Sequence, residues 1–441
     1  MSGRNTEAER LRSGTGASDN GRGPLRLRVL THTFPPSTHA NAKRPFYVVR
    51  AALAEGWEVE VWTSPRGVPG PATECLAHPR LRIHRLADPV IRWQERLQSH
   101  PRLLRGWVYL TSGLMFPDAC AGWVRKVLRA LAEAPPADRT LAFVLPASLL
   151  LAGGAGGGAD RTWVFDYQEP VSPQQMRMRR RSPLQRLWRG RLARLERDTL
   201  HRAGRVLFTA ESNRRAYVEL GLVPAPRTAH VPYFYDATFF DQPAPPPHGG
   251  FEIVYFGTFD WHGARSPGTF LRAFAEFLRR HPEARSVSRF RFHGQWPSPC
   301  EEQVRALGLA DVVVRGPVWD HDRYLEEVRR SPVLLLVVSP LHDLYMPSKI
   351  VDYLGARRPV LALVPPGSEM HGVLQRAGHD RDCCDPFDVP GTLAALERLW
   401  ADYRAGSLRA PAGDTRFWSS DVQLPIYLRH VQAAPEEPAF W

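Results

Sequence analysis

Short apolar runs alternate with segments of helical spacing from residue 25 onwards. Residues 25–30 (LRLRVL) alternate between apolar and basic side chains, which predicts a strand. Apolar residues in 45–55 recur at helical spacing, so a helix is predicted there, and Gly56 is expected to end it. Residues 57–62 (WEVEVW) alternate again. The chain therefore opens as strand, helix, strand.

The same alternation continues along the chain. It predicts further strands at 141–145, 162–165, 205–209, 251–256, 288–292, 333–338 and 360–364, and helices at 267–280 and 350–354. Repeated strand–helix units favour parallel sheets covered by helices on both faces. The predicted fold class is α/β, with two doubly wound Rossmann-like domains that face each other across a cleft. In such sheets, ligands bind outside the carboxyl ends of the strands.

Composition divides the chain into five segments. Residues 1–24 are polar and rich in Gly and Ser, which predicts a disordered tail. Residues 242–250 (QPAPPPHGG) have the proline content of a stiff domain linker. The domains are accordingly predicted at 25–241 and 251–414, followed by a last segment at 415–441.

The overall composition is that of a folded protein. Of 441 residues, 43% are hydrophobic and 23% are charged, which excludes a chain that is disordered throughout. No apolar run approaches the ~18 residues of a membrane helix. The polar N-terminal segment also lacks the apolar centre of a signal peptide. These features predict a cytoplasmic protein.

The five cysteines are scattered and odd in number, which predicts reduced thiols. One cluster combines residue types that ligate metals: His379, Asp382, Cys383, Cys384 and Asp385. Its cysteines are adjacent and lack the usual two-residue spacer, so a plain loop is favoured over a metal site. No metal site is predicted.

Two nucleotide-binding motifs are excluded. Gly154-x-Gly156-x-x-Ala159 is followed by a predicted strand rather than by the helix that a dinucleotide site needs, and no GxxxxGK[ST] sequence occurs. A better candidate is Gly257, at the end of the strand 251–256, with Arg265 shortly before a predicted helix. A glycine permits close approach of a diphosphate, and the arginine supplies a cation. A strand-end turn followed by a solvated arginine is the alternative.

A second candidate lies at the predicted helix around 350. Pro347 and Ser348 are placed at its start, Lys349 in its first turn and Asp352 about one turn further on. A cation in a first turn opposes the helix macrodipole unless it serves an anion. Lys349 is therefore a candidate phosphate ligand, and a surface lysine that lies over the strand is the alternative.

The segment Pro347-x-Lys349-x-x-Asp352-Tyr-Leu, followed by Arg358-Pro-Val-Leu-Ala, resembles the donor-binding segment of GT-B glycosyltransferases, especially family-four-like retaining enzymes. The resemblance runs from about residue 25 to 400 and rests on the order of several motifs. The others are Leu27 to Phe34 with Pro35-Pro36, Arg44, Gly56-Trp-Glu-Val-Glu-Val, Tyr255-Phe-Gly257, Phe292-His-Gly294 and Val313 to Val318.

The resemblance implies transfer of a sugar from a nucleotide-diphosphate sugar, with retention, to a hydroxyl acceptor that is a glycan, a lipid-linked molecule or a small molecule. The donor would bind to 251–414 and the acceptor to 25–241, and residues 415–441 would cross back to the first domain. Neither a cofactor nor a metal is implied.

The resemblance also implies roles for single residues. Arg265 and Lys349 would hold the diphosphate beside Gly257, Pro347 and Ser348. Asp352 would bind the ribose, and His342 or Asp343 the sugar hydroxyls. In the first domain, Glu169 aligns with an acidic residue of the family, and Asp166 is expected at a strand end, pointing toward the cleft. Either carboxylate would bind an acceptor hydroxyl, with capping of the following turn as the alternative.

One departure from the family keeps a second class of function open. The family has two glutamates eight residues apart, but here the position eight before Asp352 is Leu344. A non-catalytic GT-B scaffold, or a nucleotide-binding partner protein, is therefore the alternative to an enzyme.

Charge is concentrated between Arg177 and Arg197, where nine arginines are interleaved with apolar residues. A basic amphipathic helix of this kind can lie on an anionic membrane. A solvated helix face is the alternative. Nucleic acid is the least favoured partner, because no stacking platform or nucleic-acid module accompanies the charge.

Overall fold

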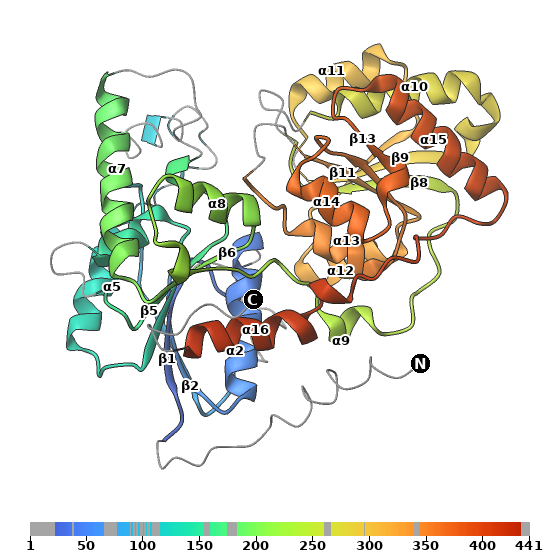
Figure 1. Cartoon of the computed structure of the whole chain (residues 1–441). Helices are drawn as coiled ribbons and strands as arrows, with labels where there is room; N and C mark the ends of the chain where they lie inside the picture. Colours follow the sequence, from blue (N-terminus) through green and yellow to red (C-terminus); the bar gives the residue numbers. More distant parts are fainter. Residues whose placement is uncertain are drawn as a thin grey trace.

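The chain folds into two α/β halves that lie side by side (Figure 1). The structure is a computed structural model that describes residues 23–37, 39–65, 77–88, 115–153, 159–173, 183–259, 266–294, 296–338 and 344–433, with scattered positions between 90 and 107. Among these residues, no helix is both long enough and apolar enough to cross a membrane.

The first half contains a seven-stranded sheet in the order β3-β2-β1-β4-β5-β6-β7, in which all neighbouring strands are parallel. Its strands are β1 (Arg26–Leu30), β2 (Glu58–Thr63), β3 (Leu81–Arg85), β4 (Arg139–Phe143), β5 (Trp163–Tyr167), β6 (Arg205–Phe208) and β7 (Thr228–His230). The helices around it are α2 (Lys43–Ala54), α5 (Ala121–Glu133), α7 (Pro183–Arg202) and α8 (Glu211–Glu219).

The second half contains a six-stranded parallel sheet in the order β10-β9-β8-β11-β12-β13. Its strands are β8 (Phe251–Phe256), β9 (Ser288–His293), β10 (Val313–Gly316), β11 (Val333–Val337), β12 (Val360–Leu363) and β13 (Cys383–Cys384). Its helices are α9 (Ala237–Phe240), α10 (Gly268–Arg280), α11 (Ser298–Ala306), α12 (His321–Arg330), α13 (Lys349–Ala356), α14 (Glu369–Arg376) and α15 (Val389–Arg404).

Apolar side chains on both faces of each sheet form the cores. In β8, Phe251, Ile253 and Tyr255 pack into one cluster, while Val254 and Phe256 pack into another on the opposite face. Successive side chains of a strand point to opposite faces of the sheet. A strand that is buried on both faces therefore reads as a near-continuous apolar run. The prediction of doubly wound α/β sheets is confirmed.

One predicted loop has a different structure. Residues 380–382 form a 3₁₀ turn, and Cys383–Cys384 forms β13, an edge strand that pairs with β12. The prediction of a plain loop there was therefore wrong, because two residues are enough to extend a parallel sheet at its edge. None of the four described cysteines forms a disulfide bond.

The chain passes between the halves twice. Tyr235 donates its backbone N–H to the Trp418 carbonyl (2.9 Å), and Ser420 donates in return to the Tyr235 carbonyl (2.8 Å). Helix α16 (Ser420–Gln432) then packs beside α2 of the first half, as the red and blue helices of Figure 1 show. The proline-rich segment 242–250 is fastened to the second half, since Pro245 accepts a hydrogen bond from Arg358 (2.7 Å).

Candidate functional site

The carboxyl end of β8 forms the centre of the site in the second half. Gly257 follows this strand with a φ of 127°, a backbone conformation that favours glycine. Its N–H donates to the carbonyl of His293 at 2.8 Å. A Cβ atom at Gly257 would lie 3.0 Å from Nζ of Lys349. The absence of a side chain therefore leaves room for the ammonium group.

Lys349 is the first residue of α13 and is partly buried. Its Nζ donates to the Phe256 carbonyl at 2.7 Å and lies 4.0 Å from the centre of the Tyr255 ring. These contacts hold a cation at the carboxyl end of a parallel strand, where such sheets bind ligands. Two segments that lie 93 residues apart in the sequence are thus brought together at Gly257 and Lys349.

Pro347 and Ser348 lie directly before this helix, as predicted. Pro347 is buried, and its carbonyl accepts a hydrogen bond from the N–H of Ile350 (3.2 Å). Ser348 occupies the N-cap position, but its side chain does not cap the helix.

Asp352 is bound by a lysine from the other half of the molecule. Its Oδ1 accepts a hydrogen bond from Nζ of Lys43 (2.5 Å), and its Oδ2 accepts one from the Tyr324 hydroxyl (3.1 Å). Only 3% of Asp352 is exposed. Burial raises the pKa of Asp352, although the Lys43 ammonium acts against this shift. Ribose binding at Asp352 would therefore require Lys43 or Tyr324 to move.

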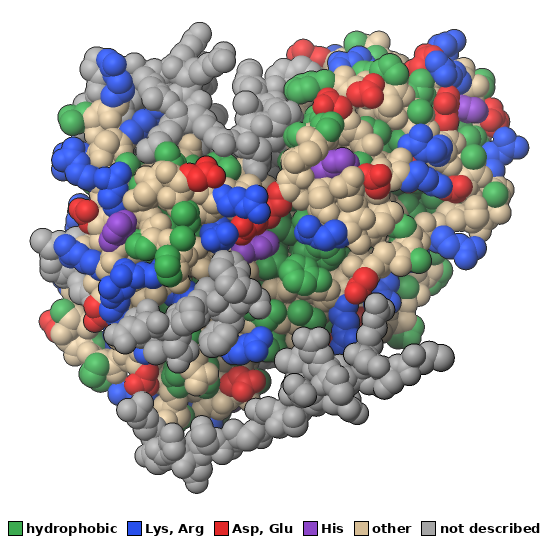
Figure 2. Space-filling view, in the orientation of Figure 1, with side chains coloured by type: hydrophobic (Ala, Val, Ile, Leu, Met, Phe, Trp, Pro, Cys, Tyr) green, Lys and Arg blue, Asp and Glu red, His purple; other side chains and the backbone are tan. Residues whose placement is uncertain are grey.

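A second charged contact joins the halves at the start of α8. Glu369 of α14 accepts hydrogen bonds from the backbone N–H groups of Glu211 (2.8 Å) and Ser212 (2.7 Å). A carboxylate at a helix N-terminus satisfies free donors and complements the macrodipole. Charged side chains of both signs gather where the two halves meet (Figure 2).

Asp166 does not face a cleft. It lies within β5, is fully buried, and accepts hydrogen bonds from Nε of Arg44 (2.8 Å) and the hydroxyl of Tyr427 (2.7 Å). Arg44 also donates to the carbonyls of Val231 and Pro232, each at 2.8 Å. The prediction that Asp166 points toward the cleft was wrong, because its buried carboxylate joins β5 to α2 and α16, while Arg44 in turn holds the segment after β7.

Glu169 lies just after β5 and is partly exposed. It is close to Tyr233, whose hydroxyl donates to Oε1 of Gln168 (3.2 Å). Burial raises the pKa of Tyr233 well above its ordinary value, and the charges of Tyr345 and Glu169 add to this effect. Of the two carboxylates predicted in the first half, Glu169 is therefore the one that can meet a ligand.

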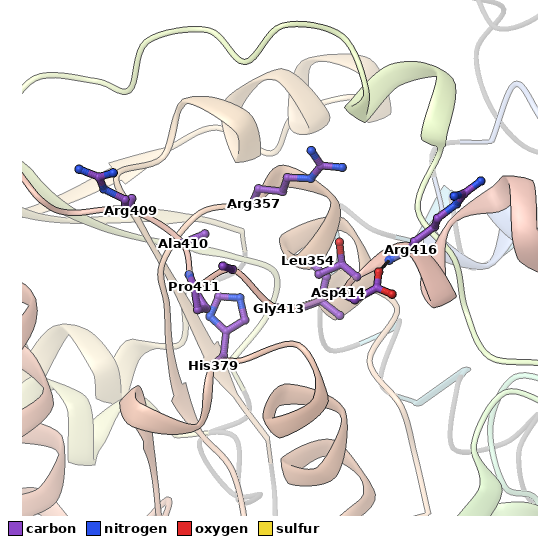
Figure 3. Close-up of a pocket in the computed structure, with 11 residues that line it drawn as sticks. Leu354, Arg357, His379, Arg409, Ala410, Pro411, Gly413, Asp414 and Arg416 are labelled. Carbon is purple, nitrogen blue, oxygen red and sulfur yellow. Dashed lines mark hydrogen bonds between the residues drawn. The ribbon is translucent and has the colours of Figure 1, made fainter. Parts of the chain in front are cut away.

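A cavity of about 380 Å³ opens beside the end of α13. Its lining includes His379, Arg357, Arg409 and Arg416, but none of the predicted site residues. Figure 3 shows the Arg409 side chain pointing away from those of Arg357 and Arg416. The three cations do not converge on one point, so this cavity lacks the arrangement that would hold a diphosphate.

Comparisons with known proteins address the fold. No protein-family model and no curated protein match the sequence. A UDP-forming α,α-trehalose-phosphate synthase from Burkholderia xenovorans, in complex with glucose-6-phosphate, matches with a TM-score of 0.62 and 14% identity, covering 93% of this chain and 100% of the other. A similar enzyme from Burkholderia vietnamiensis matches at 0.61 and 13%, covering 94% and 99%. Sucrose-phosphate synthase from Thermosynechococcus elongatus matches at 0.56 and 16%, covering 93% and 94%.

The chain has the GT-B fold. The sequence-predicted residues divide between the two halves of this GT-B molecule. Lys349 and Gly257 lie at the carboxyl end of the second sheet, and Glu169 follows a strand of the first. Arg265, His342 and Asp343 lie outside the described residues, as do Arg177, Arg179, Arg180 and Arg181.

Sequence reasoning missed the residues that join the two GT-B halves, chiefly Lys43 and Glu369. One signal was present: Lys43 is the first residue of α2. A cation at that position opposes the macrodipole and calls for an anionic partner, as was argued for Lys349. The identity of that partner, Asp352, depends on the tertiary structure.

Proposed function

We propose that this chain is a glycosyltransferase that transfers a sugar from a nucleotide-diphosphate sugar to an acceptor hydroxyl, with retention. The observation that carries the proposal is the Lys349 ammonium group, held beside Gly257 at the carboxyl end of β8 in a GT-B fold. The names of the structural neighbours, which are UDP-forming or sucrose-phosphate synthases, support the same reaction class.

In this reaction, the bond between the anomeric carbon and the diphosphate oxygen breaks. A bond to the acceptor oxygen forms on the same face of the sugar, and the acceptor proton passes to the leaving diphosphate. Negative charge grows on the diphosphate, so a fixed cation there stabilises the transition state more than the ground state. Lys349 has this role in the proposal, with Arg265 as a second cation. Two cations suffice to balance the leaving group without a metal.

The remaining donor contacts are assigned by the same resemblance. Pro347 and Ser348 shape the start of α13, and His342 or Asp343 binds sugar hydroxyls. Asp352 binds the ribose once the Lys43 ammonium has left it. The first donor to test is UDP-glucose, because the Burkholderia neighbours are described as UDP-forming and an E. coli neighbour as bound with UDP-2-fluoro glucose.

The acceptor side of the proposal rests on Glu169, which is partly exposed after β5. A carboxylate there can accept a hydrogen bond from an acceptor hydroxyl. Glucose-6-phosphate is the first acceptor to test, because one neighbour is described in complex with it.

A non-catalytic scaffold is the second candidate function, and two observations favour it. Asp166 is buried against Arg44, and the Asp352 carboxylate is bound by Lys43. Both acids are therefore engaged within the protein.

One experiment separates the two functions. The full chain is incubated with a panel of nucleotide sugars, with and without glucose-6-phosphate or an acceptor extract, and nucleotide release is measured. A glycosyltransferase releases nucleotide from one donor, and faster with an acceptor. Absence of release with every donor, alongside measurable nucleotide binding, would favour the scaffold.

We also propose that α7 contacts an anionic membrane surface. Leu192 and Glu196 anchor one side of α7 in the core, where Glu196 accepts hydrogen bonds from buried tyrosine hydroxyls. The other side exposes Arg186, Arg191, Arg194, Arg197 and the apolar Leu187. Cations around an exposed apolar residue suit a membrane interface.

Sedimentation with phosphatidylglycerol vesicles tests this contact. Binding should weaken as salt is added, since the Debye length is about 8 Å at physiological ionic strength. Two quadruple variants should each abolish binding to the vesicles. One replaces Arg186, Arg191, Arg194 and Arg197 with Gln, and the other replaces Arg177, Arg179, Arg180 and Arg181 with Gln. Gln at the exposed Arg404 and Arg409 of the second half is the control. Wild-type protein that ignores the vesicles at low salt would show that α7 presents a solvated face.

A further inference from the structure

Three side chains of different chemistry converge in the first half. His32 follows β1, Asp88 follows β3 and Cys120 precedes α5. Nε2 of His32 is 3.1 Å from Oδ2 of Asp88 and 3.7 Å from Sγ of Cys120. One potential ligand atom from each residue lies within 4.8 Å of the other two.

One nitrogen, Nε2 of His32, faces both the carboxylate and the sulfur. If Nε2 carries a proton, it donates to Asp88 and the sulfur faces the same N–H; if Nε2 carries a lone pair, it can accept from the Cys120 thiol, and the Asp88 carboxylate then faces that lone pair. A cation placed between the three atoms would accept one lone pair from each of them.

The two distances from His32 match edges of a tetrahedral zinc site. With usual zinc bond lengths, the nitrogen and oxygen ligands are about 3.3 Å apart, and the nitrogen and sulfur ligands about 3.6 Å apart. The observed separations, 3.1 and 3.7 Å, agree with these values to a few tenths of an ångström.

Charge and ligand type point to the same ion. His32 and Asp88 are 4% and 2% exposed, so charge at this place needs compensation. A thiolate and a carboxylate together balance one divalent cation. A set of nitrogen, oxygen and sulfur ligands suits zinc and disfavours calcium or magnesium, which prefer oxygen alone.

Surrounding contacts orient the ligands. The second oxygen of Asp88, Oδ1, accepts a hydrogen bond from the N–H of Val90 (3.1 Å). The His32 ring meets the Trp123 ring edge to face at 4.9 Å, and Trp123 donates to the Leu86 carbonyl at 3.0 Å. Outer contacts of this kind fix ligand orientation in metal sites.

We infer that His32, Asp88 and Cys120 bind a zinc ion, with water in the fourth position. The ion joins the ends of β1 and β3 to the start of α5. The site lies at the carboxyl ends of β1 and β3, and neither Lys349 nor Gly257 takes part in it.

The test uses the purified full chain, with zinc content measured by mass spectrometry and cobalt substitution followed by absorbance. We expect one equivalent of metal and a thiolate-to-cobalt charge-transfer band in the near ultraviolet. Cys120→Ser should abolish this band, while Cys300→Ser, which alters a buried cysteine of the second half, should retain it. His32→Ala and Asp88→Asn should weaken cobalt binding more than about tenfold, since losing even an outer partner costs 10-fold or more.

Two results would overturn the assignment: wild-type protein that binds no stoichiometric zinc or cobalt, or an unchanged band in Cys120→Ser. Loss of the band in Cys384→Ser instead would place the metal at the edge strand β13. Circular dichroism of each variant shows whether it folds. If a ligand variant fails to fold, the wild-type metal content and cobalt spectrum still decide the question.

Discussion

Lys349→Ala removes the cation on which the proposed reaction depends. In the structure, the ammonium group donates a hydrogen bond to the Phe256 carbonyl and lies 4.0 Å from the centre of the Tyr255 ring. A charge-assisted hydrogen bond to a diphosphate contributes about 1.5–3 kcal/mol. Its loss in the transition state should therefore lower kcat/KM roughly 10- to 150-fold. Folding should also lose stability, because the ammonium's hydrogen bond to the carbonyl and its contact with the ring contribute about 2–4 kcal/mol in total; rates are therefore compared per folded molecule.

The assay compares initial rates of nucleotide release, with the donor dissociation constant measured separately. Charge grows on the diphosphate during the reaction, so kcat should fall more than donor affinity. Lys349→Arg keeps the charge and should retain part of the activity. Lys126→Ala, on the exposed side of α5, is the matched control and should leave both quantities unchanged.

Unchanged kcat/KM in Lys349→Ala, in a preparation that demonstrably consumes a nucleotide sugar, would refute the reasoning. The diphosphate would then bind elsewhere. A fall in activity that merely parallels a loss of folded protein would also contradict it, because the predicted fall is in kcat/KM per folded molecule.

Three further predictions concern contacts around the site. Lys43→Met leaves the buried Asp352 carboxyl without its cation. The carboxyl can avoid a buried, unpaired charge by taking up a proton, which costs about 4 kcal/mol at pH 7 for a group of ordinary pKa 3.8. The free energy of unfolding should therefore fall by at most about 4 kcal/mol. Burial raises the pKa of Asp352, so the folded variant holds a proton that the unfolded chain releases. The fall in the free energy of unfolding, measured with urea, should therefore be smaller at pH 5 than at pH 7. A fall that does not change with pH would contradict this. Gly257→Ala places a Cβ 3.0 Å from Nζ of Lys349 at a φ of 127°, so it should destabilise the protein by about 1–3 kcal/mol and weaken donor binding, as calorimetry and a binding titration can measure. Glu369→Ala removes the acceptor at the start of α8 and should cost about 1–2 kcal/mol in the same urea assay, whereas Glu397→Ala on the surface should cost far less.

The sequence predicted the elements whose patterns are local. The strand at Phe251–Phe256 was predicted with the bounds that the structure shows, because its six residues pack into cores on both faces. Helix α13 was placed correctly around Lys349, since Pro347 and Ser348 mark a helix start. Both depend on periodicity or on local start signals, which a single sequence displays.

Elements without a clear apolar face were missed. Strand β3 has no fully buried residue, so its pattern resembles a surface segment. The pairing of Lys43 with Asp352 spans 309 residues, and that of Arg44 with Asp166 spans 122. No periodicity in the sequence encodes contacts over such separations. The buried state of Asp166 was mispredicted for this reason, and the convergence of His32, Asp88 and Cys120 was invisible for the same one.

Helix α16 has a consequence for how the molecule is made. Tyr427 and Val431 are fully buried in the core of the first half, and the Tyr427 hydroxyl reaches Asp166. A ribosome delivers residues in order, so the first half emerges early but receives these side chains only after the second half has been synthesised. Until α16 has been synthesised, it cannot pack over the apolar residues of α2 and β4 or over the Arg44–Asp166 pair. The first half is therefore completed last, and any chain shortened before Ser420 leaves a hydrophobic surface open to chaperones or to aggregation.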